Sequence, residues 1–567
     1  MSTLSSIRNF CIWLQPSDVI LPSGKQYLFH YDDAGNLKSV VMPSLARHRF
    51  RRLVSLGLYR ILYRPPGDYG TYIRDFTSAG KLQQVIYPSR HRRLTYYYAT
   101  SGQLTSLFYD WTDVKYEYYG DTELLHRVNS TDRLGSQFQC SLSYAPNMTL
   151  VEAHDASYSS CQMSLVSAKF TYIYDDFLRV TSVGAIIGPV VLPVQNATYD
   201  VSVGRLTRLK DFLFTYTRVD RELISDDNME IIRERETTGQ VKKVWFRFNN
   251  YVKFNMEVTY DAQQRLKSWR RKVGTSDLKS YDYMYDSDGN LLSFDENGQT
   301  TWRYEIDANS NIRKISHHNR DTLLEINTYN EIVNDGQASY IFDKDGFLIQ
   351  RGSDVFEYNS LGQLTHAFKP GEYEIFYYYD PIGRLVVRHD ILGRNMITQY
   401  FYGDVKHQQR VTHVYEHSTD VICTLFYDHF GQLFAMHRAQ EYFYIALDPL
   451  GSPLVIMNNM GSVKKQLVYD PLGGVLSDSD AQFKFDFGFQ GGIYDDVPKL
   501  VFLNGRVYDP RTGRFTGPDY QRFTDSVEQL WQAPEASNHY LYKGVINQRP
   551  LHQLNMMTGA HAKCDVT

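Results

Sequence analysis

The sequence has few cysteines and no long apolar segment. Its 567 residues include five cysteines: Cys11, Cys140, Cys161, Cys423 and Cys564. So small and odd a set does not form a disulfide framework, and it lacks the Cys-x-x-Cys and His-x-His spacings of zinc sites. The best apolar stretch, Val183 to Val194, is too short to cross a bilayer and contains two prolines. The first residues lack the apolar segment of a signal peptide, so we expect neither a membrane span nor an export signal in this chain.

Neither positive nor negative charge dominates the composition. Sixty Lys and Arg residues face 64 Asp and Glu residues, which gives a net charge of −4 and a pI near 6.5. This balance argues against a nucleic-acid binder, whose domain is usually strongly basic. Two basic clusters, Arg47 to Arg52 and Ser89 to Leu94, are compatible with a nucleic-acid or heparin patch. We favour solvated charges at sheet edges, which hinder aggregation between sheets.

Motifs of catalysis and cofactor binding are also missing. The sequence contains no nucleophile elbow, no Walker loop and no dinucleotide fingerprint. Asp286 to Asn290 begins like a calcium loop, but Leu291 stands where that loop needs Gly. An Asp-Gly pair between apolar segments is instead a strong signal for a hairpin turn. We therefore expect no enzyme activity, no cofactor and no bound metal.

What the sequence does have is a repeated aromatic hairpin. In "FYYYDPIGRLVVRHD" (Phe376 to Asp390), aromatic residues precede an Asp-Pro-x-Gly turn, and a Leu-Val-Val run follows it. The same order of aromatic, Asp or Asn, turn and Leu recurs at roughly 16 to 25 residue intervals, as in repeat arrays. Copies begin at His30, Thr198, Thr259, Met284, Ile341, Glu357, Phe426 and Val468. The pattern predicts an all-β protein built from hairpins.

Repetition also settles how so long a chain can fold. A single compact core stops growing near about 250 to 300 residues, but repeats pack on their neighbours and can continue. Tyrosines outnumber phenylalanines, 45 to 31, although a buried hydroxyl needs a partner. We therefore expect a spiralling sheet closed into a large hollow barrel with a partly wet aromatic lining. The alternative is a conventional sandwich with one exposed tyrosine-rich face.

Two smaller features bear on the compartment. Asn129, Asn147 and Asn196 each begin an Asn-x-Ser/Thr sequon, and their clustering favours a secreted or extracellular setting. Cys140 and Cys161 flank a loop-like stretch and could form a disulfide if their strands are neighbours. The alternative for these two cysteines is a pair of buried free thiols.

The repeats and the C-terminal region resemble the YD-repeat (Rhs) family, and most of all its animal members, the teneurins. The repeated Tyr-Asp-x-x-Gly-x-Leu spans Tyr31 to Leu476, and Gly488 to Tyr520 is similar to the Rhs-associated core. The residues that match the core motif are Gly491, Gly492, Tyr494, Asp495, Arg506, Tyr508, Asp509, Pro510, Gly513, Arg514, Phe515 and Asp519. Ile20 to Phe50 and Gln521 to Pro550 resemble teneurins more than bacterial members.

The resemblance implies three regions. These are a YD-repeat β-shell at 1–487, an Rhs-associated core at 488–550 that caps or enters the shell, and a C-terminal tail at 551–567. The chain lacks the N-terminal membrane segment, EGF-like repeats and β-propeller of the family, so its spiral is expected to leave sheet edges exposed.

The same resemblance implies a function. It indicates a fragment of a cell-surface receptor, at the extracellular face of the plasma membrane, that acts in cell–cell adhesion and neuronal development or synapse organisation. Implied partners are latrophilin-type adhesion receptors and homophilic contacts, with a homodimer in the parent receptor. The alternatives are an Rhs-type shell that encloses a toxin or C-terminal peptide, and a fragment with no function of its own. Asp509 and Asp519 do not sit in the Asp-Pro-x-Gly arrangement of the bacterial autoprotease, so we interpret them as turn and strand-end residues.

Overall fold

The computed structural model describes residues 6–7 and 15–542, apart from positions 56, 68, 121, 134, 219, 319 and 504 and the stretch 521–533. Regular structure in this part of the chain is β-strand, apart from two 3-10 turns, η1 (Phe489–Gly491) and η2 (Pro534–Ser537). The predicted all-β class is confirmed. The described residues include no helix that is long and apolar enough to span a membrane.

The strands form four antiparallel sheets, and within each sheet every strand pairs with the next one in the chain. The first sheet contains β1 (Ser6–Ile7), β2 (Asp18–Ile20), β3 (Gln26–Tyr31), β4 (Leu37–Val41), β5 (Arg47–Ser55), β6 (Leu58–Arg64), β7 (Tyr72–Phe76), β8 (Leu82–Ile86), β9 (Arg93–Tyr98), β10 (Leu104–Tyr109), β11 (Thr112–Tyr118), β12 (Leu125–Thr131), β13 (Gln137–Tyr144), β14 (Val151–Ser159), β15 (Ala168–Tyr174), β16 (Val180–Ile187), β17 (Val190–Tyr199), β18 (Leu206–Leu209), β19 (Phe212–Arg218), β20 (Arg221–Ser225), β21 (Met229–Arg235), β22 (Val241–Phe248), β23 (Tyr251–Tyr260), β24 (Leu266–Val273), β25 (Lys279–Tyr285), β26 (Leu291–Glu296), β27 (Gln299–Ile306), β28 (Ile312–His317) and β29 (Arg320–Leu323).

The other three sheets continue the chain in the same order. A two-stranded sheet holds β30 (Glu325–Ile326) and β31 (Ile332–Asn334). The next sheet contains β32 (Tyr340–Phe342), β33 (Leu348–Arg351), β34 (Asp354–Tyr358), β35 (Leu364–Lys369), β36 (Tyr373–Tyr379), β37 (Leu385–Asp390), β38 (Met396–Phe401), β39 (His413–Glu416), β40 (Val421–Tyr427), β41 (Leu433–Arg438), β42 (Glu441–Leu447), β43 (Pro453–Asn458), β44 (Val463–Tyr469) and β45 (Val475–Asp478). The last contains β46 (Ile493–Asp495), β47 (Leu500–Leu503), β48 (Arg506–Asp509) and β49 (Arg514–Phe515).

Each Tyr-Asp repeat folds as a bulge followed by a turn. In the hairpin of β23 and β24 the register shifts between Thr259 and Tyr260. The next residue, Asp261, accepts hydrogen bonds from the backbone N–H groups of Gln263 and Arg265, both at 2.9 Å. This is how Asp and Asn side chains stabilise tight turns. The bulge and the turn together explain why the aromatic and the Asp stand side by side in the sequence.

The segment that begins like a calcium loop is one of these turns. Asp286 accepts the backbone N–H of Asn290 at 2.8 Å, and Gly289 has a φ of +90°. That φ is accessible to Gly without strain. The interpretation of this segment as a hairpin turn is confirmed.

The repeat tyrosines join consecutive hairpins through their hydroxyl groups. Each hydroxyl donates to the backbone carbonyl of the Leu or Val that follows the preceding turn. Such pairs are Tyr98–Leu82, Tyr118–Leu104, Tyr144–Leu125, Tyr174–Val151, Tyr199–Val180, Tyr260–Val241, Tyr285–Leu266, Tyr379–Leu364, Tyr402–Leu385 and Tyr427–Val411. Phe could fill the same volume but could not make this bond. The preference for Tyr is thus explained by hydroxyl-to-carbonyl bonds between repeats, and it requires no wet lining.

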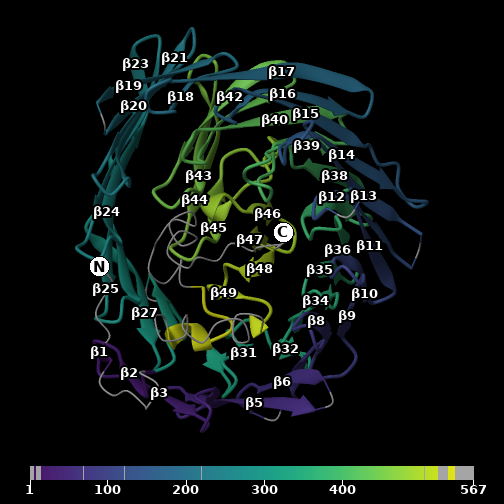
Figure 1. Ribbon diagram of the computed structural model, residues 1–567. Helices are drawn as coiled ribbons and strands as arrows, with labels where there is room; N and C mark the ends of the chain where they lie inside the picture. The colour runs from purple at the N-terminus through teal and green to yellow at the C-terminus, as the bar shows by residue number, and fades with distance from the viewer. Residues whose placement is uncertain are drawn as a thin grey trace.

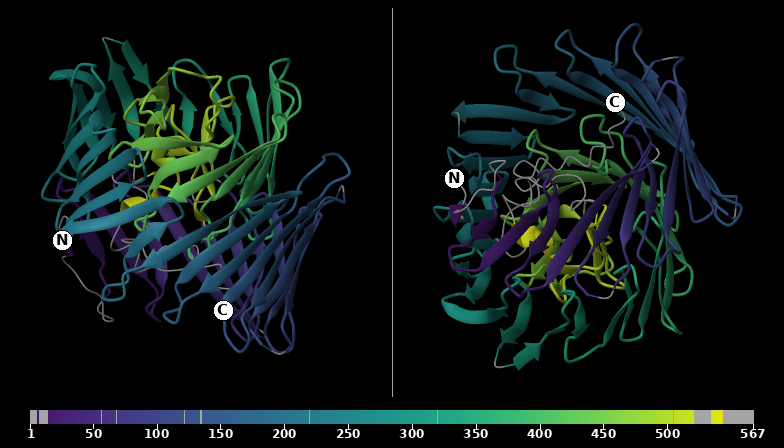
Figure 2. Two further views of the ribbon diagram at one scale, coloured as in Figure 1. Left: turned by 90° about the horizontal axis from the view of Figure 1, so that it is seen from above. Right: turned by 60° about the horizontal axis from the view of Figure 1, so that its bottom comes forward.

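The strands pass around the molecule twice. We call residues 15–285 the first winding and residues 286–478 the second winding. Figure 1 looks along the spiral, with β2 to β24 on the first circuit, β27 to β45 on the second and the last sheet in the middle. Figure 2 shows that the two windings are displaced along the spiral axis. The predicted spiralling shell is confirmed, although the described sheets are not closed by backbone hydrogen bonds.

Side chains close the shell where the second winding rests on the first, and we call this contact the seam. Serines of three Pro-Ser turns in the first winding hydrogen-bond to the repeat turns of the second: Ser23 to Asp288, Ser44 to Asn309 and Ser89 to Asp345. Further along, the Ser360 hydroxyl donates to Asp110 at 2.6 Å, and Gln399 bonds both backbone groups of Val166. These five pairs of seam partners lie more than 230 residues apart in sequence.

Candidate functional site

The described part of the predicted Rhs-associated core lies inside the shell, and its motif residues meet the wall of the second winding. Figure 1 shows β46 to β49 surrounded by the two windings. We call the wall residues and the motif residues that contact them the core clamp. The division at residue 487 stays a prediction, and the tail 551–567 lies outside the described residues.

The first part of the clamp is an ion pair between Asp495 of β46 and Arg388 of β37. Arg388 Nε and Nη2 lie 2.6 and 3.0 Å from the two carboxylate oxygens of Asp495, and Tyr377 OH donates to the same carboxylate at 2.7 Å. Asp495 and Arg388 are both buried. Burial alone would raise the pKa of Asp495, but the charge and hydrogen bonds of Arg388 hold it below its ordinary value. The carboxylate is thus held ionised and does not act as a proton donor.

The second part joins Asp509, at the end of β48, to Arg351 of β33. Arg351 Nη1 lies 2.9 Å from Asp509, while its Nη2 bonds Asp354 at 2.9 Å and the carbonyl of Pro498. Asp509 also accepts the N–H of Arg511, which closes the turn to β49. The interpretation of Asp509 as a turn and strand-end residue agrees with this geometry.

The third part surrounds the Arg514 guanidinium with amides. Its Nη1 donates to Asn311 Oδ1 at 2.7 Å, and its Nη2 donates to the carbonyl of Asn330. Asn538 also bonds Asn311, at 2.6 Å. Burial lowers the pKa of Arg514 to about 10. A guanidinium with neutral acceptors on several sides ties β49 to the turns of the second winding.

The segment after residue 533 completes the clamp with aromatic hydroxyls. Tyr540 OH donates to Glu331 at 3.0 Å and to the carbonyl of Gly346, and Tyr542 OH donates to Gln490. Burial raises the pKa of Glu331, and the hydroxyls of Tyr69 and Tyr540 partly oppose that shift. Leu541 forms an isolated antiparallel bridge with Arg514.

The remaining motif residues shape the small sheet. Arg506 lies 3.7 Å above the ring of Phe515 and 3.7 Å from Asp519. Tyr508 OH donates to the carbonyl of Leu472 at 2.7 Å. A Cβ atom at Gly492 would lie 2.6 Å from the Leu503 side chain, so only Gly fits. Of the other motif residues, Gly491 is the last residue of η1 and Tyr494 lies in β46. Pro510 and Gly513 lie in the turn between β48 and β49. The core motif therefore holds the core to the wall.

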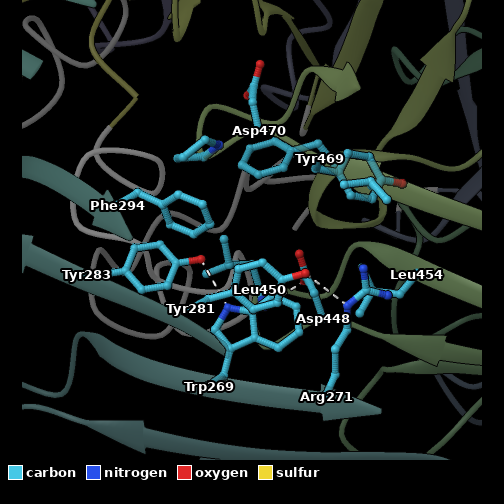
Figure 3. Close-up of a pocket in the computed structure, with 13 residues that line it drawn as sticks. Trp269, Arg271, Tyr281, Tyr283, Phe294, Asp448, Leu450, Leu454, Tyr469 and Asp470 are labelled. Atoms are coloured by element: carbon cyan, nitrogen blue, oxygen red, sulfur yellow. Dashed lines mark hydrogen bonds between the residues drawn. The ribbon is translucent and has the colours of Figure 1, made fainter. Parts of the chain in front are cut away.

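A cavity lies between strands β24 to β26 and the end of the second winding. Its volume is about 30 Å³, and Trp269, Tyr281, Tyr283 and Phe294 form one side. Figure 3 shows Asp448, Leu450 and Leu454 facing these rings. Arg271 is buried, and its Nη1 has no hydrogen-bond partner in the described part of the chain. Sequence reasoning missed this cavity because its walls are about 180 residues apart.

Two repeat aspartates of the cavity have unusual acidities. Burial raises the pKa of Asp448 to about 6 and that of Asp470 to about 7. In three repeat turns an Arg stands four residues after the Asp and bonds its carboxylate: Asp175–Arg179, Asp261–Arg265 and Asp380–Arg384. Ser452 and Gly474 occupy that position after Asp448 and Asp470. The two carboxyls can therefore titrate near neutral pH between the windings.

The predicted cysteine pair is not formed. Cys140 is a buried free thiol on β13, with Arg384 Nη2 3.6 Å and Asp380 4.0 Å from its Sγ. Cys161 is exposed on the segment after β14. The prediction failed because alternation along β13 turns Cys140 toward the seam. Burial and the charge of Asp380 raise the pKa of the Cys140 thiol to about 12.

The three sequons lie in different environments. Asn147 is exposed in the turn between β13 and β14, and Asn196 is exposed on β17. Asn129 is half-buried in the middle of β12, and its Oδ1 is shielded from solvent. Glycosylation at these positions stays a prediction.

The basic clusters are not at sheet edges. Arg47 and Arg49 are exposed on β5, but that strand is paired with β4 on one side and β6 on the other. The interpretation of these charges as edge protection was therefore wrong for β5. Within the described residues, no three His, Cys, Asp or Glu side chains gather as metal ligands.

Comparisons with known proteins agree with this architecture. The family model of the teneurin YD-shell matches residues 9–548. Teneurin-1 of Gallus gallus is 34% identical over 92% of this chain and 19% of its own length, and Teneurin-4 of Homo sapiens is 33% identical over 92% and 18%. The chain thus spans about a fifth of the length of these relatives.

Among solved structures, the crystal structure of TcdB2-TccC3-Cdc42 has a similar fold. It matches 96% of this chain and 35% of its own with a TM-score of 0.56 and 13% identity. That likeness concerns the fold alone. With the match over nearly its whole length and the clamped core inside a two-winding shell, this chain belongs to the teneurin YD-shell family.

Proposed function

We propose that this chain is the shell of a teneurin-type cell-surface receptor and acts in cell–cell adhesion, neuronal development and synapse organisation. Its partners would be latrophilin-type adhesion receptors and a second teneurin, and its place would be the extracellular face of the plasma membrane. Family membership supports the receptor type. We further propose that the shell is not an enzyme and works through surface contact.

One observation carries the non-enzymatic part of this proposal. The acidic residues of the core motif are engaged in contacts that hold the structure together, with Asp495 paired to Arg388 and Asp509 paired to Arg351. A catalytic carboxylate needs access to its substrate and a pKa suited to proton transfer. Asp495 is buried and held ionised, so it suits a clamp better than a reaction.

The test is adhesion by the full-length parent. Cells that display the parent protein should aggregate with cells that express latrophilin, and the purified shell should compete. The control is a parent with Arg388→Met, in which the core clamp is broken and the shell is expected to misfold. A correctly folded parent that binds neither latrophilin cells nor teneurin cells would contradict the proposal.

The fold likeness to TcdB2-TccC3-Cdc42 favours a second candidate, an Rhs-type shell that encloses a toxin or a C-terminal peptide. The last described residues, 538–542, contact the core inside the shell, so any following segment would start there. This candidate predicts a cleaved C-terminal peptide that stays bound. Intact mass of the purified full-length parent distinguishes the two, because an uncut chain excludes release by cleavage.

A further inference from the structure

Exposed apolar side chains form a patch on β15, β16 and β17, the strands near the upper right of Figure 1. Four large aliphatic side chains make up this outer patch: Ile173 is 63% exposed, Ile186 40%, Val191 73% and Val194 50%. Exposed clusters of this kind mark either a covered surface or an aggregation hazard. The opposite faces of the same strands carry buried residues such as Phe170 and Ala185, so the patch is not part of the core.

The strand register places these residues in two rows across the sheet, four residues apart along β16. Ile186 lies opposite Val191, and Ile173 lies opposite Ser182, which in turn lies opposite Asn196. The register shifts between Val183 and Ala185, so β17 has a bulge at the segment that contains Val194. Neighbouring strands are about 4.8 Å apart. Asn196 therefore stands in the same outward row as Ile173, next to the bulge.

Asn196 faces solvent from this row. It is exposed, whereas the next residue, Ala197, is buried, as alternation along a strand requires. Asn196-Ala197-Thr198 is an acceptor sequon for N-glycosylation. The patch and an attachment point for a bulky, hydrophilic group thus occupy one face of one strand.

We propose that an N-linked glycan on Asn196 covers the outer patch and keeps the shell from associating through it. The inference rests on the proposed function, because only a chain that enters the secretory pathway receives such a glycan. A glycan is bulky and solubilising, while the C–H faces of its sugar rings can pack on aliphatic side chains. An unmodified chain would present four aliphatic side chains to water at this site.

The other two sequons serve as matched controls. Asn147 is exposed in a turn, away from the register of the outer patch, so its glycan would not shield these side chains. Asn129 is half-buried between β11 and β13, where an attached sugar would disturb the sheet. We expect glycans on Asn147 and Asn196 and none on Asn129.

Site occupancy is measured on the full-length parent expressed in animal cells. Peptide mass spectrometry after enzymatic deglycosylation in heavy-oxygen water marks each formerly occupied Asn. Occupancy of Asn196 supports the inference. Glycan on Asn147 with Asn196 empty would overturn it and leave the proposed function intact, whereas glycan at neither position would overturn both.

Shielding is measured by self-association. Asn196→Gln and Thr198→Val both remove the sequon, and both should lose the monomer peak in size-exclusion chromatography and bind more of a hydrophobic dye. Asn147→Gln should behave as the unaltered protein. Adding Ile173→Ser and Val191→Thr to Asn196→Gln should restore the monomer, because these changes make the patch polar. Asn196→Gln and Thr198→Val variants that stay monomeric with unaltered dye binding would overturn the shielding role.

Discussion

The same repeat turn occupies opposite environments in the two windings. In the first winding, Asp175 pairs with Arg179 and the residues between them face solvent, with Phe177 66% exposed. In the second winding, Asp380 pairs with Arg384 in the same way, yet both are buried at the seam against Cys140. The turn satisfies its own backbone N–H groups, so it tolerates either environment. How much the Asp–Arg pair of a turn contributes to the stability of the fold therefore depends on how deeply that turn is buried.

The largest expected effect comes from breaking the buried turn. Asp380→Ala leaves the buried Arg384 without its carboxylate, which costs about 3–5 kcal/mol of folding free energy. The matched change Asp175→Ala in the first winding should lose far less, because solvent screens that pair. Urea unfolding of both variants measures the difference. Equal losses would contradict the comparison.

A second prediction contrasts Asp380 with Asp470, which has no Arg four residues later. Burial raises the pKa of Asp470 to about 7 in the folded state. Its stabilising contribution, on the order of a few kcal/mol, is therefore complete below pH about 4 and lost as the pH rises through about 7. Asp470→Asn should remove this slope and stabilise the protein at pH 8.

Asn is a suitable replacement, because Asn359 builds the same turn elsewhere in this chain. Unfolding free energies measured from pH 4 to pH 8 give the slope. An Asp470→Asn variant that keeps the slope of the unaltered protein would show that the cavity carboxyl does not titrate there.

A third prediction concerns the seam. Ser89→Ala removes the hydroxyl that donates to the buried carboxylate of Asp345 at 2.7 Å. Hydrogen bonds to charged groups contribute about 1.5–3 kcal/mol. Ser101→Ala, in an exposed turn of the first winding, should change stability by less than about 0.5 kcal/mol. Denaturation midpoints that shift equally for the two variants would argue against a seam at Ser89.

The smallest effect is expected from single tyrosine hydroxyls. Tyr402→Phe leaves the carbonyl of Leu385 without its donor inside the second winding and should cost about 0.5–1.5 kcal/mol. Tyr174→Phe removes the equivalent bond to Val151 at a half-buried site, where water can replace the donor. Thermal unfolding should separate the two variants in that order.

Much of the repeat structure could be predicted from the sequence. Tyr-Asp pairs, Gly in the turn and the Leu beyond it report local geometry, so the hairpins at Thr259 and Met284 were predictable. The core motif was also recognisable, because its Gly492 and Asp509 meet steric and turn requirements that only a few residue types satisfy.

The long-range contacts were not predictable in this way. Ser23 and Asp288 are 265 residues apart, and each looks like an ordinary turn residue in its own repeat. Cys140 carries no signal that it faces Arg384 of the other winding. The raised pKa of Asp470 depends on its burial among segments that are distant in sequence. Because the repeats have similar sequences, the sequence alone does not tell which repeat of the first winding contacts which repeat of the second.

The stacking of the two windings is tested most directly by zero-length cross-linking of the monomer. Lys25 Nζ lies 3.1 Å from the carboxylate of Asp288 across the seam. Treatment with a carbodiimide should join these two side chains, and peptide mass spectrometry of the monomer fraction should find the Lys25–Asp288 link. A folded monomer in which Lys25 links only to carboxylates of its own winding would contradict the two-winding shell.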